Sequence, residues 1–230
     1  MAVGADADVI VVGAGPSGSS AARCLAEAGV DVILLDKSDF PRVKTCGGGI
    51  IGVTRDCVPL GAPYVAQIYE ATFSLRGKQV RHRTSREPIM ATVKREEFDN
   101  WLLGLAKSQG VDFRPKTKVS EVREADDRVV VSTDSCGKLS SRFLIDGSGA
   151  YSTIAKQLNV TMCNVDLGFE TELAITELGD WTRRIHLDWG PIPGSYGWVF
   201  PKGDSLNVGV IAPVEAADSA TVLGSSDHFV

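Results

Sequence analysis

The stretch that decides the fold is DVIVVGAGPSG, residues 8–18. Residues 8–12 are a predicted strand, because the continuous apolar run that follows Asp8 is typical of a strand buried in a parallel sheet. The glycines then follow the pattern G-x-G-x-x-G, and a helical pattern leads to Gly29, which we expect to end the helix. A second predicted strand, residues 30–35, ends in Asp36. Strand, glycines, helix, strand and acid in this order predict an α/β fold that binds a dinucleotide.

Each part of this fingerprint has a physical task. Gly13 permits the tight turn, Gly15 lets a pyrophosphate approach the backbone, and Gly18 lets the helix pack close to the strand. The N-terminus of the helix faces the negative phosphates. Asp36 is placed to bind ribose hydroxyls. The fingerprint alone does not choose between NAD and FAD.

Composition excludes several other classes of protein. The chain has 230 residues, 43% of them hydrophobic, and its net charge is −5, which argues against a nucleic-acid partner. Residues 1–7 are too short and acidic for a signal peptide, and no apolar run has the length of a membrane span. Five scattered cysteines without C-x-x-C predict neither disulfides nor zinc, so we expect a reducing cytoplasm. Three scattered histidines predict no metal site, and His186 is expected on the polar face of a strand.

A second informative stretch is PGSYGWVFP, residues 193–201, in a chain with few aromatic residues. As a strand it places Tyr196, Trp198 and Phe200 on one face, where they would form a flat apolar wall. Such a wall is either part of the core or the lining of a pocket for a long apolar substrate. Residues 206–211 are predicted to form its hairpin partner across residues 202–204.

The rest of the chain alternates helical and strand patterns. Residues 95–109 predict a helix, residues 119–122 and 129–132 predict two strands, and residues 142–146 predict a strand that turns into a short helix. The run CGGG at residues 46–49 holds three successive glycines, which are costly to order. We expect its backbone to press against a ligand and its amides to form an anion-binding nest. The alternative is a mobile glycine loop.

Five motifs in this order resemble the geranylgeranyl reductase family, within the flavoproteins of the p-hydroxybenzoate hydroxylase class. They are the fingerprint, C-G-G-G at 46–49, R-x-x-F-D at 95–99, Asp-Gly at 146–147 and Y-x-W-x-F-P at 196–201. The resemblance implies an FAD-binding Rossmann-like domain interleaved with an antiparallel sheet that binds substrate. It implies saturation of carbon–carbon double bonds of a polyprenyl chain by hydride from reduced flavin. It also implies an electron donor, NAD(P)H or a reduced carrier such as ferredoxin, and a cytoplasmic protein in possible peripheral contact with membranes.

The resemblance also assigns roles to residues. Cys46 and Tyr196 are candidate catalytic residues, as donors or orienting groups for the proton that must reach the carbon next to the hydride acceptor. Cys46 could instead be a small apolar filler, and Arg95 a solvated residue at a helix start. The substrate wall is Tyr196, Trp198 and Phe200. The cofactor-binding residues are Gly13, Gly15, Ser17, Gly18, Asp36, Cys46, Gly47, Gly48, Gly49, Arg95 and Val119, with Val119 expected over the adenine.

These patterns also predict the domain organisation. Residues 1–62 and 92–158 are expected to form the FAD-binding domain, residues 63–91 and 159–214 the substrate sheet, and residues 215–230 a frayed end. The family has a third flavin element, a Gly-Asp-Ala-Ala-Gly turn, that these 230 residues lack, so we expect an incomplete member. Two alternatives stay open: an FAD-dependent aromatic monooxygenase or halogenase, and an inactive fragment that binds an apolar ligand or a partner.

Overall fold

The computed structural model describes residues 5–160, 166–176, 179–190 and 192–213. It divides into two compact units, which we describe separately: unit 1 with residues 1–42 and 99–162, and unit 2 with residues 43–98 and 163–230. The chain therefore passes between the units after residues 42, 98 and 162, compared with sequence-based boundaries after residues 62, 91 and 158. The expected frayed end at residues 215–230 lies outside the described residues.

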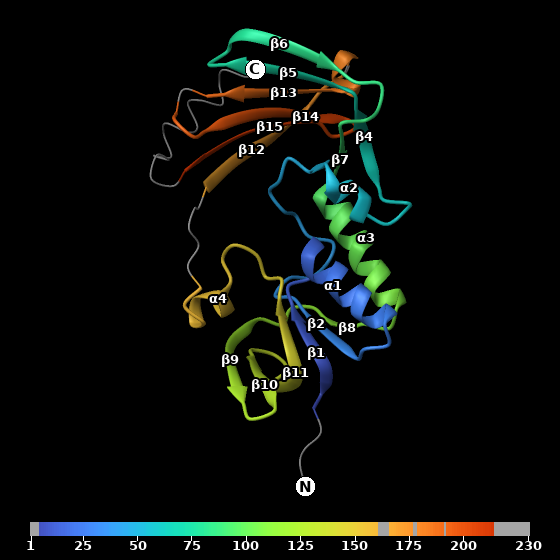
Figure 1. Cartoon of the computed structure of the whole chain (residues 1–230), viewed down its shortest axis with the longest axis vertical. Coiled ribbons are helices and arrows are strands. Elements are labelled where there is room, and N and C mark those ends of the chain that lie inside the picture. Colours follow the sequence, from blue (N-terminus) through green and yellow to red (C-terminus); the bar gives the residue numbers. More distant parts are fainter. Residues whose placement is uncertain (1–4, 161–165, 177–178, 191, 214–230) are drawn as a thin grey trace. The chain divides into compact units, whose positions relative to one another are not determined.

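Unit 1 is built on a six-stranded sheet in the order β8-β2-β1-β11-β10-β9 (Figure 1). β8, β2, β1 and β11 run parallel, and β10 and β9 continue the sheet antiparallel. This arrangement confirms the predicted Rossmann-like α/β fold. The strands are β1 (Ala7–Val12), β2 (Val32–Leu35), β8 (Asp112–Arg114), β9 (Val119–Ala125), β10 (Arg128–Thr133) and β11 (Lys138–Asp146).

The two central strands of this sheet are apolar because both of their faces are covered. Val9 and Val11 of β1 pack with Leu34 in a core cluster on one face of the sheet. Ile10 packs with Ile33 in a second cluster on the other face. All four residues of β2 are buried. The continuous apolar run that opens the sequence is thus explained by burial on two sides.

Three helices have recognisable capping signals, and the predicted stop at Gly29 is present. α1 (Pro16–Glu27) starts with proline at its first position and is followed by Gly29 at φ +80°. α3 (Arg95–Ser108) is followed by Gly110 at φ +92°. In the short α4 (Thr153–Gln157) the Ser152 hydroxyl accepts a hydrogen bond from the Ala155 N–H at 2.9 Å.

Unit 2 holds a six-stranded sheet in the order β12-β15-β14-β13-β5-β6 and a three-stranded sheet in the order β3-β7-β4 (Figure 1). The predicted hairpin is confirmed, because β14 and β15 pair antiparallel across a turn in which Gly203 has φ +84°. The elements are β3 (Gly49–Ile51), α2 (Val53–Cys57), β4 (Tyr64–Ile68), β5 (Glu70–Leu75), β6 (Lys78–Thr84), β7 (Met90–Val93), β12 (Asp166–Ala174), a 3₁₀ turn (Gly179–Thr182), β13 (Arg184–Trp189), β14 (Tyr196–Pro201) and β15 (Ser205–Pro213).

The large sheet differs in one respect from the antiparallel sheet that was expected. β13 and β5 pair parallel, with Arg184 opposite Glu70, while its other strand pairs are antiparallel. The physical reason is that these two strands come from separate stretches of the chain and are not joined by a hairpin.

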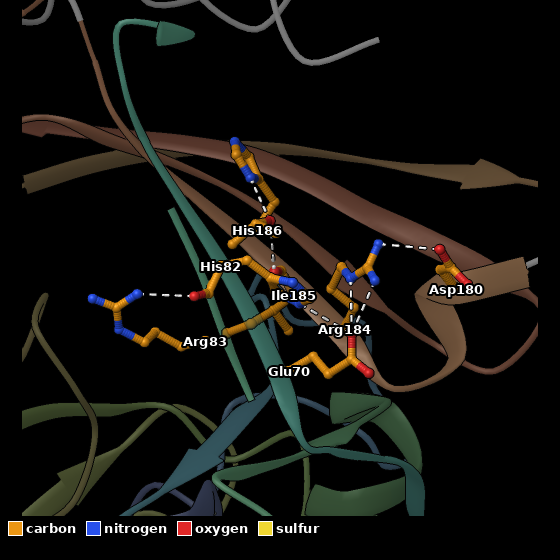
Figure 2. A network of polar contacts seen from close by, with 8 residues as sticks. Glu70, His82, Arg83, Asp180, Arg184, Ile185 and His186 are labelled. Atoms are coloured by element: carbon orange, nitrogen blue, oxygen red, sulfur yellow. Dashed lines mark hydrogen bonds and ion pairs between the residues drawn. The ribbon is translucent and has the colours of Figure 1, made fainter. Parts of the chain in front are cut away.

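The two faces of the large sheet have different chemistry. On one face, β5, β6 and β13 carry a polar network in which Glu70 accepts hydrogen bonds from Arg184 at 2.9 Å and contacts His82 at 3.2 Å (Figure 2). His186 lies on this face, with its Nδ1 at 2.7 Å from the Thr72 hydroxyl, which confirms its predicted polar position (Figure 2). Burial lowers the pKa of His186. The opposite face carries the aromatic residues of β14.

Candidate functional site

Three glycines make the turn after β1 possible because their backbones touch. Gly13 has φ +93°, and a Cβ on it would lie 2.5 Å from the Gly147 carbonyl oxygen. A Cβ on Gly18 would lie 1.7 Å from the Gly13 carbonyl oxygen. Gly147 belongs to the Asp-Gly motif, and a Cβ there would lie 3.1 Å from the Gly18 Cα. The fingerprint and the Asp-Gly motif therefore form one packed turn in unit 1, in which no side chain fits.

Gly15, by contrast, faces open space at the N-terminus of α1. Among the described atoms, a Cβ on Gly15 would meet only the Arg42 Nη2 within 4 Å, at 3.4 Å. Ser17 lies exposed in the first turn of α1, which holds no acidic residue. Free backbone N–H groups and the helix dipole make such a terminus favourable for phosphate. The open cradle therefore fits the pyrophosphate of a dinucleotide.

Arg42 is a candidate site residue that the sequence reasoning missed. Its Nη2 lies 3.1 Å from Oδ2 of Asp99, which is fully buried, and its guanidinium lies 4.9 Å from the Phe40 ring centroid. Asp99 is the last residue of the R-x-x-F-D motif, so in unit 1 this motif positions a cation beside Gly15. The only signal for it in the sequence is a basic residue soon after the second strand of the fingerprint.

Asp36 has a structural task that the sequence reasoning did not predict. Its Oδ2 accepts the Ala14 N–H at 2.7 Å and its Oδ1 accepts the Ser38 N–H at 2.8 Å, so the carboxylate fixes the glycine turn. Each oxygen keeps a further lone pair for a ribose hydroxyl. Val119 packs its side chain into a core cluster of the sheet with Ile10, so its position over the adenine stays a prediction.

In unit 2, the C-G-G-G loop packs directly on the aromatic strand β14. A Cβ on Gly47 would lie 3.0 Å from both the Trp198 Nε1 and the Phe200 Cδ2. Gly48 has φ +68°, and a Cβ there would lie 2.2 Å from the Lys202 Nζ and from the Val93 carbonyl oxygen. For these two glycines the close approach is to the protein itself, which also requires the absence of side chains.

Cys46 is held in place by hydrogen bonds at its backbone and its sulfur. Its N–H donates to the Glu170 Oε1 at 2.7 Å, and its Sγ accepts the Gly48 N–H at 3.4 Å. The Glu170 Oε2 is buried and has no hydrogen-bond partner in the part of the chain that the structure describes. These contacts fix the backbone amide and the sulfur of Cys46.

Lys202 lies under the same loop and is 2% exposed, which is rare for a lysine. Its Nζ donates to the Val93 carbonyl oxygen at 2.6 Å and reaches the Cys46 carbonyl oxygen at 3.4 Å. Burial lowers the pKa of Lys202, and the charge of nearby Arg95 adds to this, against the opposing effect of Glu172. Lys202 is a second residue that the sequence reasoning missed, because nothing local distinguishes it from a surface lysine.

The predicted aromatic face exists. The ring centroids of Tyr196 and Trp198 are 6.1 Å apart and those of Trp198 and Phe200 6.3 Å apart, tilted by 51° and 41° rather than forming a flat wall. Trp198 is 8% exposed, lies over Gly209, and donates from Nε1 to the Asn207 Oδ1 at 2.6 Å. Trp198 is therefore anchored in the sheet, whereas Tyr196 is 40% exposed.

Strand register extends this face beyond the three predicted residues. Leu187 of β13 lies opposite Trp198, and Phe73 of β5 lies opposite Leu187. Trp189 lies opposite Tyr196 and stacks on Phe73 with ring centroids 5.8 Å apart. We call Phe73, Leu187, Trp189, Tyr196, Trp198 and Phe200 the apolar wall.

The two candidate catalytic residues lie near different parts of the wall. The loop that starts with Cys46 packs on Trp198 and Phe200, while Tyr196 lies beyond Trp198 at the exposed start of β14.

No cluster of three or more His, Cys, Asp or Glu side chains with metal-binding geometry occurs among the described residues. No helix within the described ranges has the length and apolar character to cross a membrane.

Comparison with known proteins agrees with this geometry. Residues 6–174 match the model of the FAD binding domain family. The chain is 30% identical to digeranylgeranylglycerophospholipid reductase 2 of Methanosphaera stadtmanae over 223 residues, which cover 89% of this chain and 56% of the relative. It is also 30% identical to geranylgeranyl diphosphate reductase of Rhodobacter capsulatus over 228 residues, which cover 94% of this chain and 58% of the relative. The chain thus spans about half the length of the curated relatives it matches.

Solved structures share the fold. A geranylgeranyl bacteriochlorophyll reductase-like protein from Thermoplasma acidophilum aligns with a TM-score of 0.84 and 21% identity, over 97% of this chain and 61% of that one. Halogenase PltM, solved with phloroglucinol and FAD, aligns with a TM-score of 0.75 and 16% identity, over 96% of this chain and 56% of that one. The resemblance to geranylgeranyl reductases that the five motifs indicated is confirmed.

Proposed function

The chain belongs to the family of FAD binding domains, and on this premise we propose that it is the flavin- and substrate-binding part of a reductase that saturates carbon–carbon double bonds in a polyprenyl chain. Its cofactor is FAD. The observation that carries the proposal lies within unit 2, where the C-G-G-G loop packs directly against Trp198 and Phe200. The loop assigned to the flavin and the wall assigned to the prenyl chain are therefore in contact.

The glycine turn of unit 1 would hold the ADP half of FAD. The open face at Gly15 and the first turn of α1 with Ser17 would receive the pyrophosphate, and Gly13 and Gly18 would keep the turn tight. Arg42, fixed by its ion pair to Asp99, would add a charge-assisted contact to a phosphate oxygen. Asp36 would bind ribose hydroxyls, and Val119 would lie over the adenine.

The flavin part would contact the loop from Cys46 to Gly49, together with Arg95. When bound and reduced, FAD supplies a hydride to one carbon of the double bond. The neighbouring carbon then needs a proton. Cys46, whose sulfur and amide are fixed by Gly48 and Glu170, and Tyr196, whose hydroxyl is at the exposed end of the wall, would donate or orient it.

The apolar wall would bind the isoprenoid chain and exclude water from it. Its residues contribute apolar area rather than directed polar contacts, so recognition follows shape. One methylene in an apolar pocket contributes only about 1–3 kcal/mol, and we therefore expect loose selectivity for chain length. We also propose that the protein takes electrons from NAD(P)H or a reduced carrier such as ferredoxin.

An anaerobic experiment tests the reductase. The flavin-loaded protein is photoreduced without oxygen and mixed with geranylgeranyl diphosphate, and we expect the absorbance of oxidised flavin to return and the product to gain two hydrogens per reduced bond. The variant Trp198→Ala should slow this reaction far more than it weakens FAD binding. A protein that binds FAD but leaves it reduced in the presence of the alkene would contradict the proposal.

The same experiment separates the alternatives. A halogenase or aromatic monooxygenase, whose fold the PltM structure shares, would react only when oxygen is admitted. An inactive fragment would fail earlier, because titration with FAD would show no binding. A reductase needs neither oxygen nor halide, so oxidation of the flavin by the alkene alone distinguishes it from both.

A further inference from the structure

One row of side chains across the large sheet of unit 2 is apolar and yet exposed. Trp189 of β13 lies opposite Tyr196 of β14 on one side and Leu75 of β5 on the other. Their exposed fractions are 47%, 40% and 49%. Single exposed apolar residues are common, but three adjacent ones on neighbouring strands form a patch, and patches of this kind mark interaction sites. We call these three residues the exposed row.

The strand beside this row is strongly basic. β6 has the sequence KQVRHRT, all seven residues are exposed, and β6 is an edge strand of the sheet among the described elements. Lys78 lies opposite Leu75, Arg81 opposite Phe73, and Arg83 opposite Ala71. Arg76 lies in the turn between β5 and β6. We call Arg76, Lys78, Arg81 and Arg83 the basic edge.

The basic edge has no charge partner in the part of the chain that the structure describes. The guanidinium groups of Arg81 and Arg83 donate to backbone carbonyls at 3.4 and 2.9 Å, and no carboxylate of the described residues lies within ion-pair distance of either. The chain as a whole has a net charge of −5, whereas the basic edge has four positive charges close together. The surface around this turn and strand is therefore positive on a protein that is negative overall. A positive surface of this kind attracts an anionic surface.

Charges alone on an edge strand have a simpler explanation, because they prevent edge-to-edge pairing of sheets. That explanation does not require an exposed tryptophan, tyrosine and leucine in the adjoining row. Aromatic side chains with polar tips, next to lysine and arginine, are the combination that lies at the interface between lipid headgroups and acyl chains. Arg81 and Arg83 lie opposite Phe73 and Ala71, and residues that pair directly across two strands share one face of the sheet. Both arginines are therefore on the same face as the exposed row.

We propose that the exposed row and the basic edge together bind the surface of an anionic phospholipid bilayer. The exposed row shares Trp189 and Tyr196 with the apolar wall, in which Trp189 stacks on Phe73 and Tyr196 neighbours Trp198. A prenyl chain that leaves the bilayer at this edge would pass directly onto the wall. The inference rests on the proposed function for the identity of the substrate, but the binding itself requires neither flavin nor turnover.

Vesicle flotation of the full chain tests the proposal. Vesicles of phosphatidylcholine with phosphatidylglycerol are compared with vesicles of phosphatidylcholine alone, and we expect binding to the anionic vesicles that weakens as salt is added. Each basic residue near an anionic surface raises partitioning roughly fivefold, so the double variant Arg81→Gln/Arg83→Gln should lower it about thirtyfold. Trp189→Ala should lower it on both kinds of vesicle.

A matched control removes the same charge elsewhere. Lys107→Gln/Lys138→Gln neutralises two exposed lysines of unit 1 and should leave vesicle binding within about twofold of the parent, as expected for cations outside the contact surface. Unchanged melting temperatures show that each variant is folded. Binding that is absent in the parent, or reduced equally by the control pair, overturns the proposal.

Two further outcomes would also overturn it. If the Arg81→Gln/Arg83→Gln variant loses affinity for soluble geranylgeranyl diphosphate by the same factor without vesicles, the cations bind the substrate headgroup instead. If the parent dimerises and this variant does not, β6 is an interface between two copies of the chain. Failure of the reductase assay with vesicle binding intact would refute the proposed function and leave the bilayer surface standing.

Discussion

The variant Gly209→Ala tests how the apolar wall is anchored. Gly209 of β15 lies opposite Trp198, and a Cβ added there would lie 2.1 Å from the Trp198 Cζ2 and 2.5 Å from its Cε2. Van der Waals contact begins at 3.4 Å, so the indole must shift by about 1.3 Å. The backbone at this position needs no positive φ, so the steric conflict with the ring is the whole effect.

The expected cost follows from two contributions. Forcing a methyl group into a packed site costs roughly 1–3 kcal/mol. A displaced indole also loses its 2.6 Å hydrogen bond to Asn207, which is fully buried. A buried acceptor without a partner costs roughly 1–3 kcal/mol more. We therefore expect Gly209→Ala to lower the free energy of unfolding by about 2–6 kcal/mol.

Urea denaturation and native-state hydrogen exchange measure this effect. Amide protection should fall in β14 and β15, and affinity for a prenyl substrate should fall with it, while the FAD affinity of the glycine turn in unit 1 is unchanged. Gly104→Ala is the control, because Gly104 is helical with nothing within 4 Å of the added Cβ, and alanine there should stabilise by up to about 1 kcal/mol. A loss below about 1 kcal/mol in Gly209→Ala would refute the reasoning.

Three further predictions concern the cofactor turn and the buried lysine. Gly15→Val should leave the melting temperature nearly unchanged but abolish FAD binding in calorimetry, because its side chain would fill an open cradle. Asp99→Asn should lower the free energy of unfolding, measured with denaturant, by about 2 kcal/mol and should weaken FAD binding. This loss is smaller than the roughly 3–5 kcal/mol for breaking a fully buried ion pair, because Arg42 is partly exposed. Because the folded-state pKa of Lys202 is lowered, the unfolded chain binds more protons between that pKa and 10.5, so stability should rise with pH across this window. Lys202→Met should remove this rise, and an unchanged pH profile would contradict the assignment to Lys202.

The elements that the sequence predicts well are those with local causes. The strand at residues 8–12, the glycine turn and the helix that follows are set by neighbouring residues, and each is present in unit 1. The hairpin of β14 and β15 is equally local, because a turn with Gly203 joins its strands. Backbone rules within about ten residues therefore account for these elements.

The missed features depend on residues that are far apart in the chain. The Arg42–Asp99 pair and the extension of the wall to Phe73 depend on tertiary packing and strand register, which no local pattern contains. Lys202 can be buried because the carbonyl oxygens of Val93 and Cys46 accept hydrogen bonds from its side-chain nitrogen. The sequence does not show these partners, and a lysine without them is expected at the surface. The roles of Cys46 and Tyr196 stay predictions that the reductase assay tests.

The interleaving of the two units has a consequence for how the chain is made. In unit 2, Glu70 and Arg184 are 114 residues apart in sequence yet form a parallel strand pair, and in unit 1 Asp6 and Ser140 are 134 residues apart yet hydrogen-bond. A ribosome that adds 5–20 residues per second needs about 6–23 s between the synthesis of β5 and of β13. During that time β5 has been synthesised and can pair with β6, but the edge of β5 that pairs with β13 has no partner. We expect nascent chains stalled before β13 to need a chaperone until β13, β14 and β15 have been made and the sheet can form.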